Sequence, residues 1–322
     1  MNTHRPFCPP ACLPDSRGTV VTVGSFDGVH LGHQAVLAEV ARRARAAERA
    51  SVLVTFEPHP LAVINPPAAP PLLTTGPERL EILAQTPIDY ALFLRFDRAL
   101  ARLSPDEFVR DVLLACCGMQ DLVFGYDHGF GRNRSGDVET LRRLGAELGF
   151  AVDAVPPADV EGEPISSGRI RRAVAGGDLR TAARLLGRPY TVSGRVTAGE
   201  RRGRLLGVPT LNLGEIPPDK LLPPDGVYAV WVEWRGGRAG GMMNQGGRPT
   251  FDDGRRILEA HLFGFEGDLY GEWVRVEWVE RLRDVRRFAG VEPLQEQLRR
   301  DRARAEAILA GGPTDLSRVT HA

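Results

Sequence analysis

The chain has 322 residues, with 41 basic and 41 acidic side chains and a formal net charge of zero. This length predicts about two domains, and the zero charge excludes a general attraction to nucleic acid or to an anionic membrane surface. No apolar stretch has the length of a membrane span, and residues 1–15 lack the apolar core of a signal peptide. Four cysteines in so long a chain do not form a disulfide framework, so a reducing cytoplasm is the expected location.

Cysteine spacing and lysine content exclude two common ways of binding a ligand. Cys8 and Cys12, like Cys116 and Cys117, lack the two-residue spacing typical of a zinc site, which leaves zinc as a minor alternative. Lys220 is the only lysine, whereas a P-loop requires a lysine after its second glycine. Any nucleotide chemistry must therefore use arginine, histidine, backbone amides or a metal ion.

The first half of the chain alternates between strand-like and helix-like patterns. Apolar residues recur at helical spacing over residues 35–50, and Ser104 begins a helix with a capping box. Alternation of this kind predicts a parallel sheet covered by helices on both faces. The expected strands are residues 19–24, 51–56, 90–96, 121–126 and 150–155.

Residues 24–33, GSFDGVHLGH, lie where the first strand leads into the first helix. His30 and His33 flank Gly32, and a helix N-terminus offers unpaired N–H groups and a partial positive charge that suit phosphate. Two imidazoles that donate N–H bonds would stabilise the charge that develops during phosphoryl-type transfer. The alternative from these residues alone is a glycine turn with two solvent-exposed histidines.

Three further polar clusters also follow strand-like segments. TFEPHP places His59 after the second strand, and residues 125–137 add two arginines and four glycines after another. ISSGRIRRAV, residues 165–174, combines serines and arginines at a second helix start, as expected for holding a polyphosphate. Because ligands of parallel sheets bind at the carboxyl ends of the strands, these clusters are expected at one site.

The pattern changes near Gly187, which follows a helix that Asp178 caps. From there the chain reads as alternating strands with glycine-rich connections, followed by a final helix, which predicts an antiparallel barrel with a terminal helix. The expected domains are therefore residues 1–187 and 188–322. The expected strands of the barrel are residues 190–196, 210–213, 226–234, 257–265 and 272–280, and the helix covers residues 293–310.

Two pairs of polar residues on the expected barrel strands are candidates for a second site. Thr210 and Asn212 point to one face of a strand, and their oxygen atoms suit Mg²⁺. Glu259 and His261 share a face in the same way, and a carboxylate at an inward-facing barrel position would act as a general base for a hydroxyl. The alternative is a solvent-facing polar pair on an edge strand.

Several motifs together resemble the bacterial bifunctional riboflavin kinase/FAD synthetase family. GSFDGVHLGH, TFEPHP, GYDHGFGRNRSGD and ISSGRIR occur in the order found in its Rossmann-like HxGH nucleotidyltransferase half. The second half of the chain is similar to the riboflavin kinase barrel of the family in four segments: GRLLGVPTLN, PPDGVYAV, NQGGRPTF and DLYGE. The resemblance covers nearly the whole chain and joins both domains, so it implies phosphorylation of riboflavin to FMN by ATP, followed by adenylylation of FMN to FAD.

The resemblance also implies roles for residues of the first half. His30 and His33 would contact the ATP phosphates that undergo transfer, and Ser166, Ser167 and Arg171 would hold the departing pyrophosphate. Gly168 replaces a threonine of the family motif, and His128 and Gly129 replace the usual residues beside the flavin. Further expected contacts are Gly24, Phe26, Asp27 and Gly28 with the nucleotide phosphates, and His59, Asp127 and Arg134 with flavin or nucleotide.

For the second half, the resemblance implies that Thr210 and Asn212 bind Mg²⁺ with ATP. Glu259 would deprotonate the ribityl hydroxyl, and Gly199, Gly203 and Gly207 would let the backbone approach the phosphates. Asn244 and Arg248 lie in the family's N-x-G-x-R-P-T-F loop without an assigned role, and Gln245 replaces its common isoleucine.

The expected partners are riboflavin, FMN and ATP, with no nucleic acid and no membrane. Whether the chain forms a homo-oligomer is left open. Two alternatives stand beside the main interpretation: a single-activity flavin kinase with a decayed adenylyltransferase half, and a non-catalytic flavin-binding regulator.

Overall fold

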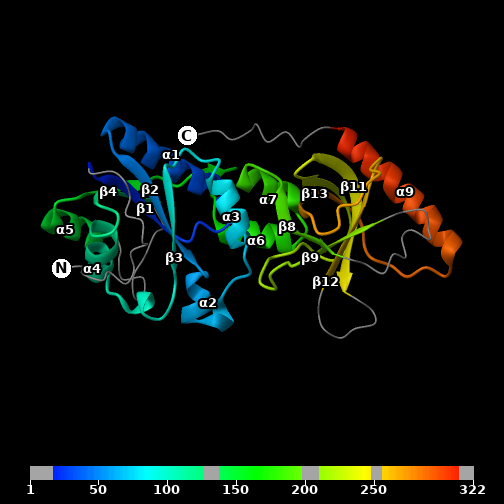
Figure 1. The fold of residues 1–322 in the computed structure, drawn as a ribbon, viewed down its shortest axis with the longest axis horizontal. Helices are drawn as coiled ribbons and strands as arrows, with labels where there is room; N and C mark the ends of the chain where they lie inside the picture. The colour runs from blue at the N-terminus through cyan, green and yellow to red at the C-terminus, as the bar shows by residue number, and fades with distance from the viewer. Residues whose placement is uncertain (1–16, 126–137, 198–209, 248–255, 312–322) are drawn as a thin grey trace. The chain divides into compact units, whose positions relative to one another are not determined.

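The computed structural model describes residues 17–125, 138–197, 210–247 and 256–311. The chain divides into two compact units, of which one ends at Ser167 and the second begins at Gly168. Each unit is described by itself (Figure 1). The domain boundary expected between residues 187 and 188 stays a prediction.

The first unit is built on a five-stranded sheet in the order β3-β2-β1-β4-β5. All four pairs of neighbouring strands are parallel, which confirms the predicted α/β class. The order reverses between β1 and β4, so the end of β1 lies at the point where such sheets bind ligands. The strands are β1 (Thr19–Val23), β2 (Ala50–Glu57), β3 (Tyr90–Arg95), β4 (Met119–Gly125) and β5 (Ala151–Val155).

Helices cover both faces of this sheet. Alternate residues of β1 enter different hydrophobic clusters: Val21 and Val23 belong to one, and Val20 belongs to the other. Helix α1 (Leu31–Ala46) buries the five residues whose spacing predicted a helix there: Val36, Leu37, Val40, Ala41 and Ala44. The other helices of the unit are α2 (Pro60–Ile64), α3 (Gly76–Leu83), α4 (Pro105–Phe108) and α5 (Val138–Leu148), with the 3₁₀ helices η1 (Pro66–Ala68) and η2 (Leu100–Arg102). The π-helix η3 (Val109–Leu114) directly continues α4.

Predicted helix ends are confirmed at several positions. Ser104 and Glu107 form the expected capping box at the start of α4. Asp178 accepts from the backbone N–H of Thr181 and caps α7 (Leu179–Leu186), which ends at Gly187 with φ 72°. Helix α6 (Ser167–Ala175) begins at the second predicted helix start. The hairpin of β6 (Asp159–Val160) and β7 (Glu163–Pro164) precedes it.

The second unit contains a closed barrel in the order β10-β11-β12-β9-β8-β13, with all pairs antiparallel. Its strands are β8 (Tyr190–Thr197), β9 (Leu211–Gly214), β10 (Gly226–Trp234), β11 (Gly237–Gly247), β12 (Arg256–Leu262) and β13 (Trp273–Arg283). The sequence predicted five of these strands and missed β11.

The terminal helix α9 (Val291–Ala310) packs on the outside of the barrel (Figure 1). Ala305 and Leu309 of this helix join Val227, Ala229 and Met242 in one hydrophobic cluster. The face of β11 that carries Met242 is therefore the outer face. Among the helices that the structure describes, none combines the length and the hydropathy needed to cross a membrane.

Candidate functional site

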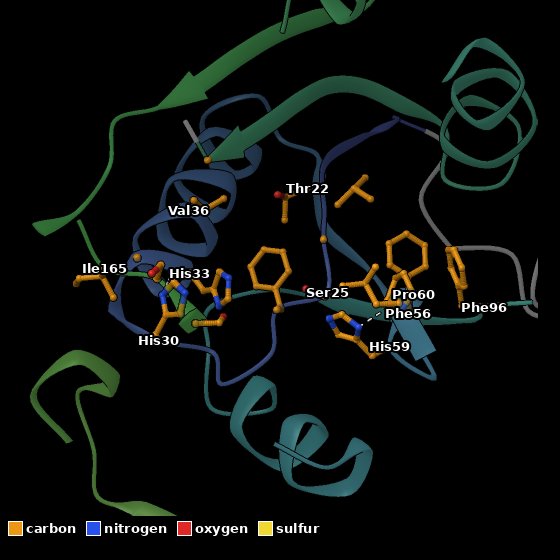
Figure 2. Close-up of a pocket in the computed structure, with 18 of the residues that line it drawn as sticks. Thr22, Ser25, His30, His33, Val36, Phe56, His59, Pro60, Phe96 and Ile165 are labelled. Carbon is orange, nitrogen blue, oxygen red and sulfur yellow. Dashed lines mark hydrogen bonds between the residues drawn. The ribbon is translucent and has the colours of Figure 1, made fainter. Parts of the chain in front are cut away.

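A cavity of about 830 Å³ opens at the carboxyl ends of the strands in the first unit. Figure 2 shows His30, His33 and Ile165 at one end of it and Phe56, His59 and Phe96 at the other. The cavity gathers three of the segments that the sequence analysis expected at one site. Its lining includes Gly24, Phe26, His30, His33, His59, Ser166 and Ser167.

The two histidines lie against each other at the start of α1. The ring centroids of His30 and His33 are 3.6 Å apart, with an angle of 14° between the planes. Nδ1 of His30 accepts from the backbone N–H of His33 at 3.2 Å, so His30 caps the helix with its side chain. A Cβ atom at Gly32 would lie 3.2 Å from the His30 ring, which explains the glycine between the two histidines.

This capping bond determines how His30 can act. Because Nδ1 accepts a hydrogen bond, it carries no proton, and the neutral ring holds its proton on Nε2. The first turn of α1 has no acidic side chain, so no carboxylate offsets the positive end of the helix dipole. The helix start therefore suits an anion, as predicted.

Asp27 and Gly28, both expected at the phosphates, do not line the cavity. The Asp27 carboxylate is buried and accepts from the backbone N–H groups of Leu73 and Thr74, at 3.0 and 2.9 Å. Thr74 Oγ1 accepts from the backbone N–H of Gly28 and donates to Asp27. The role that this geometry gives Asp27 is to fix the turn.

The second predicted phosphate segment reaches the cavity through its serines. Ser167 Oγ donates to the backbone carbonyl of Asp27 at 3.0 Å, and Ser166 is exposed. Arg171 lies one turn further along α6, on the same face as Ser167. His59 caps α2, its Nδ1 accepting from the backbone N–H of Leu61 at 3.2 Å.

Sequence reasoning missed Arg79, a buried residue of α3. Its guanidinium donates to the backbone carbonyls of Ser25 and Phe56, each at 2.8 Å, and to Glu57 Oε2 at 2.6 Å. Burial lowers the pKa of Arg79, and the Glu57 carboxylate acts in the opposite direction. No sequence motif indicated this residue, because a charged side chain on a short helix is normally expected to face the solvent.

The barrel carries a row of polar residues across adjacent strands. Glu259 of β12 lies directly opposite Asn212 of β9 on one side and Asn244 of β11 on the other. Thr210, just before β9, has its Oγ1 at hydrogen-bond distance from Glu259 Oε1, 2.5 Å. Thr197 of β8 pairs with Asn212 and extends the row. The structure therefore brings the three predicted residues together and adds Asn244, which lies in a strand rather than in the expected loop.

The expected inward orientation of Glu259 is wrong. Residues opposite each other on paired strands share a face, and His261 lies opposite Met242, which is on the outer face. Glu259 shares this outer face with His261, whereas the buried Leu258 and Ala260 point to the interior. In the sequence ILEAHL, apolar and polar residues alternate in part, but this pattern does not show which of the two faces lies inside the barrel.

The side chains of the barrel row offer mainly oxygen donors, and their chemistry can be compared with the preferences of a magnesium ion. A hydroxyl, an amide carbonyl and a carboxylate are ligands that hard divalent cations prefer. The hydroxyl is that of Thr210, the amide carbonyl that of Asn212 and the carboxylate that of Glu259. The oxygen atoms of Thr210 and Glu259 already lie at hydrogen-bond distance. The donor set therefore fits Mg²⁺.

The remaining expected site residues lie outside the described parts of the chain. They are Cys8, Cys12, Asp127, His128, Gly129, Arg134, Gly199, Gly203, Gly207 and Arg248.

Comparisons with known proteins identify both units. The protein-family model described as FAD synthetase matches residues 12–169, and the one described as riboflavin kinase matches residues 186–309. A bifunctional riboflavin kinase/FMN adenylyltransferase of Pseudomonas fluorescens is 39% identical over 298 residues, covering 92% of this chain and 95% of the relative. The chain belongs to the bifunctional riboflavin kinase/FMN adenylyltransferase family. Both catalytic domains of the family are present, and the chain is an enzyme.

Two further similarities extend over most of the chain. The bifunctional riboflavin kinase/FMN adenylyltransferase of Escherichia coli K12 is 38% identical, covering 88% of this chain and 90% of the relative. A solved structure described as a macrolide-efflux protein from Streptococcus pneumoniae has a TM-score of 0.82 and 31% identity, covering 94% of this chain and 96% of its own. The two-domain fold is therefore shared along nearly the whole length.

Proposed function

We propose that the barrel unit phosphorylates riboflavin to FMN and that the cavity of the first unit adenylylates FMN to FAD. The observation that carries this proposal is that each unit brings together residues at the centre of its own predicted site. His30 and His33 stack in the cavity of the first unit, and Thr210 contacts Glu259 on the barrel. The presence of both pairs in one chain favours a bifunctional enzyme over a kinase with a decayed second half or a regulator without catalysis.

In adenylyl transfer, a phosphate oxygen of FMN attacks the α-phosphorus of ATP. The bond from that phosphorus to the bridging oxygen breaks, and pyrophosphate leaves. His30 donates from Nε2 to the phosphate oxygens, because its Nδ1 is held by the helix. His33, stacked on it, faces the same phosphates, and the positive end of α1 stabilises the charge that builds up there.

The two ends of the cavity differ in a way that orients the substrates. The histidine end is polar, and Ser166 and Ser167 lie there to receive the departing pyrophosphate together with Arg171. The other end is lined by Phe56, Phe96, Leu100, Leu103 and Phe108, which suit a flat, apolar flavin ring. His59 lies at this end and would contact the flavin or the nucleotide (Figure 2).

On the barrel, Glu259 takes the proton of the ribityl 5′-hydroxyl. The hydroxyl oxygen attacks the γ-phosphorus of ATP, and ADP leaves. Thr210 orients the Glu259 carboxylate through their 2.5 Å contact. Thr210 and Asn212 would hold Mg²⁺, which neutralises the phosphate charge when bound. Asn244 lies opposite Glu259 on the neighbouring strand, and its amide would bind the same substrate hydroxyl.

The domain division at residues 187 and 188 remains part of this proposal. The riboflavin kinase match begins at residue 186, within two residues of the proposed start of the barrel domain, which supports a boundary near this position. We propose riboflavin, FMN and ATP as the partners, without nucleic acid or membrane, in a cytoplasmic setting.

Incubation of the purified protein with riboflavin, ATP and Mg²⁺, followed by chromatographic separation of the flavins, tests the proposal. FMN should appear first, and FAD should follow together with pyrophosphate. FMN without FAD would favour a decayed adenylyltransferase half, and unchanged riboflavin would favour a binding protein.

A further inference from the structure

The turn that joins β1 to α1 contains a strained backbone. Phe26 has φ 47° and Val29 has φ 38°, although neither is glycine. A positive φ is rare for such residues and especially unfavourable for a β-branched valine. Strained conformations of this kind persist only where the surrounding structure holds them, and they cluster at functional sites.

Two sets of contacts from outside the turn hold it. The first fixes its middle: Leu73 and Thr74 donate to the Asp27 carboxylate. The second fixes its beginning: the backbone carbonyl of Ser25 accepts from Thr55 Oγ1 at 3.1 Å and from Arg79 at 2.8 Å. The orientation of the Ser25–Phe26 peptide is thereby determined by side chains of β2 and α3.

Arg79 joins the ends of two strands. One guanidinium nitrogen donates to Ser25 after β1, and another donates to the carbonyl of Phe56 and to Glu57 at the end of β2. Its charged group lies 5.2 Å from the centre of the Phe93 ring. The side chain is only 2% exposed, so water does not compete for these bonds. A lysine keeps the charge but lacks the planar fork that reaches both carbonyls at once.

A continuous series of contacts leads from the Ser25 carbonyl to the two histidines. Ser25 is followed by Phe26, whose ring centroid lies 4.6 Å from that of His33. His33 in turn stacks on His30 at 3.6 Å. Arg79 itself does not line the cavity. An effect of Arg79 on His30 and His33 therefore passes through the turn, whereas its bond to the Phe56 carbonyl reaches the other end of the cavity.

We propose that Arg79 is a positioning residue for adenylyl transfer. By holding the Ser25 carbonyl it fixes Phe26, and the Phe26 ring sets His33 against the reacting phosphates. This inference rests on the proposed function of the cavity. Because misplacement of a catalytic group by about 1 Å costs roughly a hundredfold in rate, a small shift of the turn is sufficient.

The first test replaces Arg79 by lysine in the full chain. R79K should lower kcat for FAD formation from FMN by about ten- to a hundredfold, with KM for ATP and FMN changed less than threefold. Riboflavin phosphorylation by the same preparation should be unchanged, because the barrel is a separate unit. L80A is the matched control: Leu80 is the next residue of α3 and is 54% exposed, and its replacement should leave both rates unchanged.

The second test asks whether Arg79 acts through Phe26. F26L removes the aromatic ring that contacts His33, and R79K added to it should reduce the rate less than twofold further. The Cε1 proton of His33 supplies an independent signal, since the neighbouring rings shift its NMR resonance. R79K and F26L should move this resonance in the same direction, and L80A should leave it in place.

The outcomes separate failure of the inference from failure of the proposed function. If the wild-type protein makes no FAD from FMN, the proposed function is wrong. If the wild type is active and R79K retains its full kcat, or if R79K and F26L multiply as independent effects, the inference is overturned. An R79K protein whose first unit does not fold would lose the NMR signature of His33 and all FAD formation, while the separate barrel unit would keep its kinase activity. Such a complete loss, in place of a kcat lowered about ten- to a hundredfold with the His33 resonance retained, would overturn the inference.

Discussion

The cavity of the first unit and the row of residues on the barrel use different kinds of scaffold. The cavity takes its polar groups from turns and helix starts that follow strands, and distant side chains such as Thr74 and Arg79 hold those turns in place. The barrel row takes Asn212, Glu259 and Asn244 from three adjacent strands in register. Substitutions far from the chemistry should therefore disturb the cavity more than the barrel row, where strand pairing alone aligns the residues.

The largest effect is expected at the barrel row. Glu259→Gln keeps the side-chain volume and a hydrogen-bonding oxygen but removes the basicity, which is typically worth about a hundred- to ten-thousandfold in rate. Riboflavin phosphorylation should fall by that factor, and FAD formation from FMN should not change. Both rates are measured on one preparation by chromatography of the flavins.

A wild-type kinase rate in this variant would show that Glu259 is not the base, and His261 on the same face would be the next candidate. Loss of FAD formation in the same variant would mean that the two sites depend on each other.

The reciprocal change at the cavity is His33→Ala. It removes an imidazole donor and the ring that stacks on His30, and loss of such a donor costs about a hundredfold or more in rate. FMN should accumulate from riboflavin while FAD formation almost stops. A near-normal yield of FAD would refute the assignment of the cavity to adenylyl transfer.

How far the sequence predicted these two regions depended on whether the signal was local. The buried face of α1 and the caps at Ser104 and Asp178 follow from short-range spacing, and the structure confirms them. Helix α3 shows the limit, because its sequence suggests a buried Leu80 and an exposed Arg79. The structure has the reverse, with Leu80 54% exposed and Arg79 2% exposed. Only the carbonyls at the ends of β1 and β2, which are distant in sequence, explain a buried arginine.

Strand β11 was missed for a related reason. Its sequence GRAGGMMNQGG is rich in glycine, which disfavours a strand in isolation. A Cβ atom at Gly241 would lie 2.4 Å from the backbone oxygen of His261 on the neighbouring strand. Close approach of the two strands requires the glycine, and this partner is not visible in the local sequence.

The attachment of α9 gives a prediction on the stability of the barrel unit. Asp301 is 4% exposed and accepts from Arg283 at 2.9 Å and from Gln297 at 2.7 Å. Asp301→Ala leaves Arg283 without its carboxylate, and breaking a buried pair in this way costs about 3–5 kcal/mol. All four tryptophans, residues 231, 234, 273 and 278, lie on barrel strands, so tryptophan fluorescence during urea unfolding reports this unit.

Glu296→Ala on the same helix is the control. Glu296 forms ion pairs with Arg299 and Arg300 that are largely exposed, so the free energy of unfolding should change by less than about 1 kcal/mol. Equal effects of the two substitutions would contradict the role of the buried pair.

The smallest effect is expected on the surface of the first unit, where α1 carries Glu39. Its hydrogen bond with Arg42, followed by that with Arg43, lowers the pKa of Glu39 from 4.5 to about 2. A pKa that is lower in the folded state stabilises the protein above the unfolded pKa, and this stabilisation is lost as the pH falls toward 2. Because Arg42 is 65% exposed and screened by solvent, Glu39→Gln should reduce the free energy of unfolding at pH 7 by only about 0.5–1 kcal/mol.

Thermal unfolding followed by circular dichroism at pH 7, 5 and 4 checks this prediction. The difference between wild type and Glu39→Gln should narrow as the pH falls. Glu48→Gln, at a much more exposed pair with Arg17, should show no measurable difference at any of these pH values. If the difference in stability between wild type and Glu39→Gln widens toward low pH, the pKa of Glu39 is raised in the folded state and not lowered.

Mixing the two active-site variants tests most directly the central claim that the two sites act independently of each other. Glu259→Gln alone should leave riboflavin unchanged, and His33→Ala alone should stop at FMN. When both variants are incubated together with riboflavin, ATP and Mg²⁺, FMN released by one should be converted to FAD by the other, and FAD should accumulate. If wild-type protein makes FAD under these conditions and the mixture makes none, each site requires the other in the same chain, and the account of two independent sites is wrong.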